Sequence, residues 1–288
     1  MSNRVSGKTK LCGLIGDPIE HTMSPVMHNA AFKHLGIDYQ YLPFRVRKEE
    51  LGKAIMGMRA LNIRGLNVTI PHKVAVIPFL DELDTLAERT GAVNTIVNND
   101  GVLKGYNTDA GGFIRALLDG GADPAEKKVV VLGAGGASRA ISFSLAEKGA
   151  HLVILNRREE LDWALELAKR ISQVFKKDVK ALVLDAENLS SVLNTADILV
   201  NATSVGMSPN ISETPVPAGL LKPGLVVFDV VYNPIKTRLR QDAEEVGVLT
   251  IGGLDMLVWQ GALAFELWTG LQAHFGLMKE ESLKVLGL

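Results

Sequence analysis

Cysteine is almost absent from this chain of 288 residues. The only one, Cys12, lies in an apolar run near the N-terminus. One cysteine cannot form an internal disulfide, and a structural metal site usually needs several cysteine or histidine ligands. Three of the six histidines, His21, His28 and His72, also lack the spacing of metal ligands. We therefore predict no metal site, and we expect Cys12 to be a small buried hydrophobe and His72 to be structural.

Long hydrophobic runs and an excess of charge of one sign are missing as well. No apolar stretch reaches the about 18 residues that cross a bilayer, and residues 1–10 lack the apolar core of a signal peptide. Lys and Arg number 31 and Asp and Glu 32, so the formal net charge is -1. This balance does not favour nucleic acid or an anionic membrane as a partner. The sequence predicts a cytoplasmic protein that binds neither nucleic acid nor membranes.

The pattern of apolar runs predicts two α/β domains, for which the length is sufficient. Helical patterns separate short apolar runs at 129–132, 152–155, 181–184, 198–201, 226–230 and 248–250. Such alternation predicts a parallel sheet with helices on both faces. In the first third, we expect strands at 11–15, 39–44 and 65–70, helices at 24–35 and 49–61, and a hairpin that turns at Asn99-Asp100-Gly101.

The C-terminal tail has helical patterns, at 254–269 and around Leu283, but no strand to pair with. We expect it to fold back onto the N-terminal domain. The predicted architecture is therefore an N-terminal α/β substrate domain, residues 1–109, completed by C-terminal helices within residues 253–288. Residues 110–252 would form a Rossmann-like domain with a parallel sheet that binds a dinucleotide.

A glycine-rich turn follows the strand at 129–132, and it predicts a dinucleotide site. Its residues are Gly133, Ala134, Gly135, Gly136, Ala137 and Ser138. The first glycine allows the tight turn, the second lets a pyrophosphate approach the backbone, and the next helix offers unpaired N–H groups to that anion. A glycine pair alone is weak evidence. Here the strand before it and the helix after it favour the dinucleotide over an ordinary turn.

The end of the next strand bears on the choice of cofactor, because it meets the adenine ribose in this fold. The residues there are Asn156, Arg157 and Arg158. Arginine suits the 2′-phosphate of NADP, since its planar fork binds phosphate oxygens in pairs. Alternatively, the arginines are a solvated face, and Glu159 reads the ribose hydroxyl of NAD. We expect NADP, with NAD possible.

Lys73 and Asp109 are the candidates for proton transfer, which a hydride transfer between alcohol and ketone requires. Lys73 follows a strand that stops at Pro71, and Asp109 lies at the expected start of a helix. Spacing alone favours a simpler view, in which Asp109 caps that helix and Lys73 lies on the surface.

Other small polar residues interrupt apolar segments and are candidates for substrate contacts. Thr22 and Ser24 flank Met23, Asn94 interrupts an apolar strand, and Gln260 is the polar side chain between Met256 and Phe265. Buried amides need hydrogen-bond partners, which a polyhydroxy substrate would supply. The alternatives are a helix cap for Ser24, a satisfied loop amide for Asn94 and an exposed helix face for Gln260.

The chain resembles the shikimate and quinate dehydrogenase family over nearly its whole length. The matching motifs occur in the family's order: Gly16 to Pro25, Asn67 to Lys73, Gly91 to Thr95, Gly105 to Asp109, Asn201 to Met207, Asp229 to Pro234, Gly252 to Leu257, and Trp259 to Ala262. The resemblance implies reversible, NADPH-dependent reduction of 3-dehydroshikimate to shikimate in aromatic amino acid biosynthesis. It also implies a monomer or a homodimer.

The resemblance further implies a role for each candidate. Thr22 and Ser24 would bind the substrate carboxylate, while Thr69, Asn94, Asp109, Tyr232 and Gln260 would hold the ring hydroxyls or the carboxylate. Lys73 would be the acid/base group and would work with Asp109. Gly133 to Ala137 would hold the pyrophosphate, Asn156 to Arg158 the adenosine phosphate, and Val230 and Gly253 would lie beside the nicotinamide.

Two positions depart from the family's pattern. Thr22 replaces the usual serine, and its added methyl group narrows the carboxylate pocket or changes discrimination between shikimate and quinate. Leu161 stands where the family often has a second basic residue, which resembles the branch that also accepts NAD. Three alternatives therefore remain open: a quinate/shikimate dehydrogenase that uses NAD or both cofactors, a non-catalytic NADP-sensing protein, and a different dehydrogenase on a similar frame.

Overall fold

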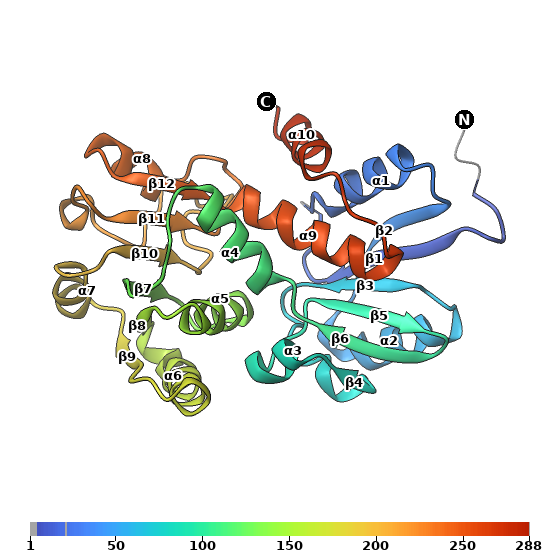
Figure 1. Ribbon diagram of the computed structural model, residues 1–288, viewed down its shortest axis with the longest axis horizontal. Coiled ribbons are helices and arrows are strands. Elements are labelled where there is room, and N and C mark those ends of the chain that lie inside the picture. Colours follow the sequence, from blue (N-terminus) through green and yellow to red (C-terminus); the bar gives the residue numbers. More distant parts are fainter. Residues whose placement is uncertain (1–4, 21, 288) are drawn as a thin grey trace. The chain divides into compact units, whose positions relative to one another are not determined.

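The computed structural model describes residues 5–20 and 22–287. The chain divides into two compact units, of which the first comprises Met1–Thr108 with Val258–Leu288 and the second Asp109–Leu257. Each unit contains a six-stranded sheet with helices packed against it (Figure 1). The fold is thus the two-domain α/β fold that the sequence predicts.

The second unit has a fully parallel sheet in the order β12-β11-β10-β7-β8-β9. Its strands are β7 (Lys128–Leu132), β8 (His151–Asn156), β9 (Lys180–Val183), β10 (Ile198–Asn201), β11 (Val226–Asp229) and β12 (Leu249–Gly252). Its helices are α4 (Asp109–Asp119), α5 (Gly136–Glu147), α6 (Leu161–Phe175), α7 (Ala186–Leu193) and α8 (Arg238–Glu245). All six strands lie where the apolar runs predict them.

Both faces of this sheet are covered, which explains why its strands are continuous apolar runs. Side chains alternate between the faces. Val227 packs in a core cluster with Leu189 of α7 and Leu239 of α8. Its neighbour Phe228 points the other way, and its ring lies 4.7 Å from that of Phe113 in α4. Figure 1 shows α7 and α8 on one side of the sheet and α4 and α5 on the other.

The first unit has a mixed sheet in the order β2-β1-β3-β5-β6-β4. Its strands are β1 (Lys10–Gly16), β2 (Tyr39–Arg45), β3 (Gly65–Val68), β4 (Glu82–Leu83), β5 (Thr95–Asn99) and β6 (Val102–Tyr106). Its helices are α1 (Ser24–His34), α2 (Leu51–Ala60), α3 (Thr85–Thr90) and α10 (Phe275–Val285), while α9 (Gly253–Thr269) begins in the second unit and continues into this one. Short 3-10 helices lie at Lys48–Glu50, Ile77–Phe79, Arg158–Glu160 and Ala218–Leu220.

The C-terminal helices complete this first unit. Leu66 of β3 packs with Ile55 of α2 on one face of the sheet. Gly65 faces the opposite side, where a Cβ atom would lie 2.0 Å from Nε1 of Trp268 in α9. The Trp268 Nε1–H donates to the carbonyl of Ile96 at 3.1 Å, and α10 packs against α1. The expectation that the tail folds back onto the N-terminal domain is confirmed.

Local differences from the sequence predictions are few and have simple reasons. Ser24 is the first residue of α1, not its cap, because the chain already turns into the helix at Met23. Strand β3 stops at Val68, two residues earlier than expected. Helix α3 was not expected, although the carboxylate of Asp84 accepts from the N–H of Ala87 at 2.8 Å and Gly91 ends the helix with φ +64°. Both are ordinary helix signals.

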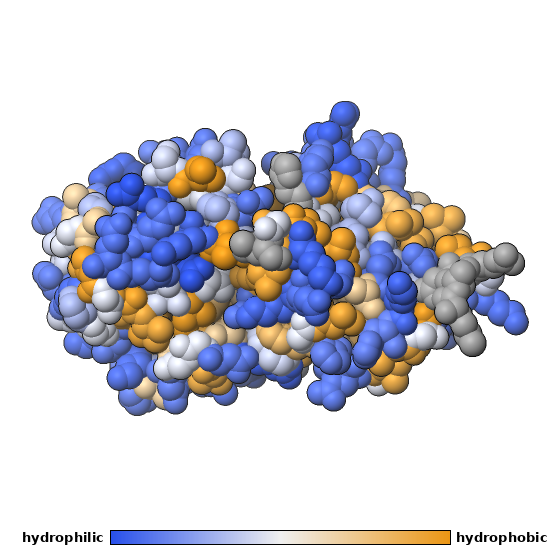
Figure 2. Space-filling view, turned by 90° about the horizontal axis from the view of Figure 1, so that it is seen from above, coloured by the Kyte–Doolittle hydropathy of each residue, from blue (hydrophilic) through white to orange (hydrophobic). Residues whose placement is uncertain are grey.

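Two expected structural roles are seen. Cys12 is buried, and burial raises the pKa of its thiol. The ring of His72 is also buried, with Nε2 at 2.6 Å from the carbonyl of Val46. Figure 2 shows polar and apolar side chains interspersed over one face, as on ordinary protein surfaces. Among the described residues, no helix is long and apolar enough to cross a membrane.

Candidate functional site

The glycine-rich turn after β7 has the geometry of a dinucleotide loop. Gly133 adopts φ +99°, a conformation that favours glycine, and a Cβ atom there would lie 3.1 Å from the carbonyl of Ala202. Gly135 is exposed, and a Cβ atom there would meet nothing within 4 Å, so its backbone is open to a ligand. Ser138 ties the turn to the helix, because its hydroxyl donates to the Gly133 carbonyl at 2.5 Å.

The turn lies where a doubly wound sheet binds its ligands. From β7 the chain proceeds to β8 and β9, and then returns to β10 on the other side of β7. At such a switch point, the carboxyl ends of the strands and the N-terminus of the next helix face the ligand. Gly136 and Ala137 begin α5, so their N–H groups belong to that first, unpaired turn. These residues fit a pyrophosphate.

The residues expected at the adenosine end lie together at the end of β8. Asn156 is buried, and its Nδ2 donates to the carbonyl of Glu160 at 2.8 Å, which shapes the turn. Arg157 and Arg158 are exposed on that turn. The Arg157 guanidinium forms an ion pair with the carboxylate of Glu160. The Arg157 guanidinium is therefore already bound to a carboxylate, which weakens its interaction with a phosphate.

Val230 and Gly253, the residues assigned to the nicotinamide, touch each other. Val230 follows β11, and Gly253 is the first residue of α9. A Cβ atom on Gly253 would lie 2.0 Å from the Val230 carbonyl oxygen. The two backbone segments can approach this closely only because residue 253 is glycine.

A buried carboxylate fixes the loop that carries Val230 and Tyr232. Asp229, at the end of β11, is fully buried. It accepts hydrogen bonds from Asn201 Nδ2 at 3.0 Å, from the Val231 N–H at 3.1 Å and from the Thr237 hydroxyl at 2.6 Å. Burial raises the pKa of Asp229, and these donors oppose that rise. The loop from 230 to 237 is thus held at both ends by one side chain.

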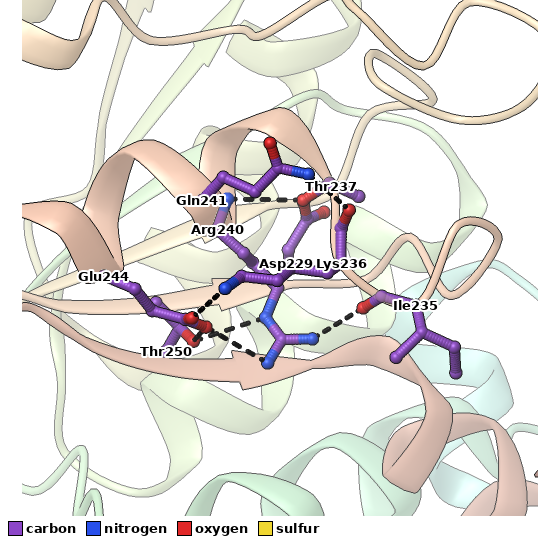
Figure 3. A network of polar contacts seen from close by, with 8 residues as sticks. All are labelled: Asp229, Ile235, Lys236, Thr237, Arg240, Gln241, Glu244 and Thr250. Carbon is purple, nitrogen blue, oxygen red and sulfur yellow. Dashed lines mark hydrogen bonds and ion pairs between the residues drawn. The ribbon is translucent and has the colours of Figure 1, made fainter. Parts of the chain in front are cut away.

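Figure 3 shows how α8 extends this arrangement. The Arg240 guanidinium donates to the Ile235 carbonyl at 2.6 Å and lies 3.6 Å from the Glu244 carboxylate. Lys236 forms an ion pair with the same carboxylate at 2.6 Å. The C-terminal part of the loop, at Ile235 and Lys236, is therefore bound to side chains of α8.

Replacing Asp229 with asparagine should destabilise the protein by about 1–3 kcal/mol, because an amide nitrogen would then face buried donors. The KM for the dinucleotide should rise as the loop relaxes. Urea unfolding and initial rates measure the two effects. Asp178→Asn, the same change at an exposed site between α6 and β9, is the control. Equal stability of the two variants would contradict the assigned role of Asp229.

The two residues assigned to the substrate carboxylate are adjacent in the first unit. Thr22 is partly buried, and its Oγ1 accepts from the Ser24 N–H at 3.3 Å. Because this bond uses the threonine oxygen as an acceptor, its hydroxyl proton is free to point elsewhere. His21, between them and the preceding strand, lies outside the described residues.

Two amides expected to bind substrate contact each other. Asn94 lies directly before β5 and Gln260 lies in α9; both are buried. The Nδ2 of Asn94 donates to Oε1 of Gln260 at 3.3 Å. Thr69, partly buried, follows β3, and its N–H donates to the Ile15 carbonyl at 3.0 Å. The expectation that Gln260 is enclosed, not exposed on a helix face, agrees with this geometry.

The backbone of Lys73 is hydrogen-bonded to Val93, the residue that precedes Asn94. Lys73 is partly buried in the turn after β3, and its carbonyl accepts from the Val93 N–H at 2.7 Å. Asp109 is buried as the first residue of α4, in the second unit. Tyr232 is also in the second unit, and burial raises the pKa of its phenol. The other assigned substrate residues belong to the first unit.

Sequence reasoning missed the polar residues behind Asn94. Asn67, Thr95 and Thr108 are all buried and hydrogen-bonded to the Asn94 side chain or backbone. A signal was present for Asn67, because a polar residue between Leu66 and Val68 interrupts a strand that is buried on both faces. Among residues 5–20 and 22–287, no group of three or more His, Cys, Asp or Glu side chains could hold a metal ion.

Comparison with family models places three matches along the chain. Residues 14–96 match the shikimate dehydrogenase substrate binding domain, residues 118–250 match shikimate / quinate 5-dehydrogenase, and residues 253–281 match the shikimate 5′-dehydrogenase C-terminal domain. The three matches follow the order of the motifs described above.

Individual relatives are similar over nearly their whole length. A shikimate dehydrogenase (NADP(+)) of Dehalococcoides mccartyi strain CBDB1 is 49% identical over 272 residues, 94% of each chain. A crystal structure of shikimate dehydrogenase in complex with NADP+ is 44% identical, with a TM-score of 0.93 over 98% of both chains. The enzyme from Listeria monocytogenes, in complex with shikimate and NAD, is also 44% identical, with a TM-score of 0.91 over 97% of this chain and 98% of that one.

Proposed function

The chain belongs to the shikimate dehydrogenase family, and we propose that it reduces 3-dehydroshikimate to shikimate reversibly with NADPH. The observation that carries this proposal is the convergence of three distant motifs in the first unit. Val93 binds the backbone of Lys73, and the next residue, Asn94, binds Gln260. The backbone at Lys73 is thus joined to the segment whose next residue, Asn94, meets Gln260.

The proposed chemistry at the substrate is a proton transfer coupled to hydride addition. NADPH, when bound, supplies the hydride to the C3 carbonyl carbon. The Lys73 ammonium donates its proton to the carbonyl oxygen, which becomes the C3 hydroxyl, and Lys73 regains a proton from solvent. We assign Asp109 as the residue that works with Lys73 in this step. In the oxidative direction, neutral Lys73 accepts the proton.

The remaining assigned residues bind and orient the substrate. Thr22 and Ser24 donate hydroxyl hydrogens to the carboxylate. The ring hydroxyls or the carboxylate are held by a second group of residues, namely Thr69, Asn94, Asp109, Tyr232 and Gln260. Fixing the ring in this way places C3 for reaction and accounts for specificity, since buried polar groups penalise a substrate that leaves them unpaired.

For the cofactor, we assign the pyrophosphate to Gly133 through Ala137 and the 2′-phosphate to Asn156, Arg157 and Arg158. We assign substrate binding to residues 1–109 with 253–288 and dinucleotide binding to residues 110–252. The proposed setting is the cytoplasm, with the protein as a monomer or a homodimer, which light scattering on the purified protein distinguishes.

A quinate/shikimate dehydrogenase that uses NAD is the second candidate, and the Arg157–Glu160 ion pair favours it. Initial rates with shikimate or quinate and with NADP or NAD separate the two. We expect kcat/KM with shikimate to be about tenfold higher with NADP than with NAD, because the arginines bind the 2′-phosphate. A preference for NAD with measurable quinate oxidation would replace the main proposal. Tight NADP binding without turnover would indicate a sensing protein.

A further inference from the structure

A chain of buried hydrogen bonds leads from the core of the first unit to the amides assigned to the substrate. The Tyr41 hydroxyl donates to Oδ1 of Asn67 at 2.7 Å. Asn67 Nδ2 donates to the Thr95 hydroxyl at 3.1 Å, and that hydroxyl donates to Oδ1 of Asn94 at 3.1 Å. Each link passes from a donor to an acceptor in the same direction, from β2 through β3 to the start of β5.

Backbone groups that can only donate or only accept agree with this direction. The N–H of Thr108, which can only donate, lies 2.7 Å from Oδ1 of Asn94. The carbonyl of Asn94, which can only accept, lies 3.3 Å from Nδ2 of Asn67. Both amides are therefore oriented as the chain requires. It follows that Nδ2 of Asn94 is the group that faces the Thr108 hydroxyl at 2.9 Å and Oε1 of Gln260 at 3.3 Å.

Burial makes each link matter. Tyr41 and Thr95 are completely buried, Asn94 is 2% exposed, Asn67 4% and Gln260 9%. Water cannot readily replace a lost partner at such sites, so an interrupted chain leaves a polar atom unsatisfied. The ring of Tyr41 is itself fixed, because it stacks on the His28 ring at a centroid distance of 4.5 Å. Burial lowers the pKa of His28 to about 3, so that ring is neutral and packs as an apolar group.

We propose that Thr95 is a positioning residue, and that the chain from Tyr41 through Thr95, together with the Thr108 N–H, holds the Asn94 amide in the orientation in which it meets Gln260. This inference rests on the proposed function and deepens it, because it names the residues that orient the Asn94 amide toward Gln260. Thr95 itself does not touch the substrate.

Valine at position 95 tests the proposal, because it keeps the shape of threonine and removes the hydroxyl. For Thr95→Val we expect kcat/KM with shikimate to fall about tenfold, and the KM for NADP to stay within about twofold. Thr95→Ser keeps the hydroxyl and should restore most of the activity. Thr90→Val is the matched control, because Thr90 is equally buried and its hydroxyl lies 3.3 Å from the carbonyls of Ala87 and Ala92.

A second variant keeps the test decisive if Thr95→Val folds poorly. Tyr41→Phe removes the first donor of the chain, and it should lower kcat/KM with shikimate in the same way. In the double variant the two losses should not multiply, because both interrupt one chain. Thermal unfolding and NADP binding report the fold of each protein.

The outcomes separate the inference from the function on which it rests. No turnover of shikimate by the wild-type protein refutes the proposed function. Turnover by the wild type, with Thr95→Val as active as Thr95→Ser, refutes the positioning role. Equal losses for shikimate and NADP would also refute it, because they would indicate a general structural defect.

Discussion

Replacing Lys73 with alanine is expected to lower kcat with shikimate by about 10²–10⁴, with a modest effect on substrate binding. Alanine removes the group that we assign to proton exchange with the C3 oxygen, whereas the residues that we assign to substrate binding, among them Thr22, Ser24, Asn94 and Gln260, remain in place. Steady-state kinetics give kcat and KM, and a competition experiment gives the affinity for shikimate. Unchanged turnover would exclude Lys73 from the chemistry.

Two further variants separate proton transfer from charge. Lys73→Arg keeps a positive charge, but a guanidinium does not release its proton in proteins, so this variant should also be slow. Near wild-type activity in Lys73→Arg would mean that charge alone suffices. Lys53→Ala is the matched control, since the Lys53 side chain is 77% exposed and pairs only weakly with Glu50 across one helical turn.

Replacing Gly253 with alanine should have the second largest effect. The added methyl group would lie 2.0 Å from the Val230 carbonyl oxygen, and both partners are backbone. Neither can rotate away, so we expect a loss of about 1–3 kcal/mol in the free energy of unfolding. The shift should also move Val230, which we assign to the nicotinamide, and a displacement of about 1 Å near reacting atoms can slow turnover about 10²-fold.

The control for this change is Gly57→Ala in α2, where a Cβ atom would meet nothing within 4 Å. Alanine is the better helix former, so this variant should be more stable by about 0.5–1 kcal/mol. Urea unfolding compares the two variants, and initial rates with varied NADP measure the effect on the cofactor. A Gly253→Ala protein with wild-type stability would contradict this prediction, because it would show that the backbone at Val230 can move at little cost in free energy.

The parallel sheet of the second unit could be predicted from the sequence, because strands that are buried on both faces consist of continuous apolar residues. Strands such as β7 and β10 are apolar over most of their length. Each can be identified from its own residues, without knowledge of the strand that pairs with it. The glycine turn could be predicted for a related reason. Gly133 has a positive φ, and the backbone at Gly135 is open to a ligand. Both features require or favour glycine, so the glycines themselves indicate the turn.

The site could be predicted only as a set of residues, since spacing does not say which of them meet. Asn94 and Gln260 are 166 positions apart, and their contact depends on how α9 joins the N-terminal sheet. The alternative role of Ser24 as a helix cap is wrong, because the sequence signal for a helix start does not distinguish the cap from the first turn. Tyr41 and Thr95 carry no signal at all, because aromatic and β-branched residues are ordinary in strands.

The attachment of Trp268 has a consequence for the order in which the protein can fold as it is synthesised. Its indole fills the space above Gly65 and binds the Ile96 carbonyl, and the Arg64 side chain donates to the Trp268 carbonyl at 2.9 Å. Residues 1–108 leave the ribosome first, yet these partners arrive only with residues 258–288. The second unit, residues 109–257, is continuous in the chain. It can therefore fold before the first unit is complete, because the first unit still lacks its C-terminal helices at that stage.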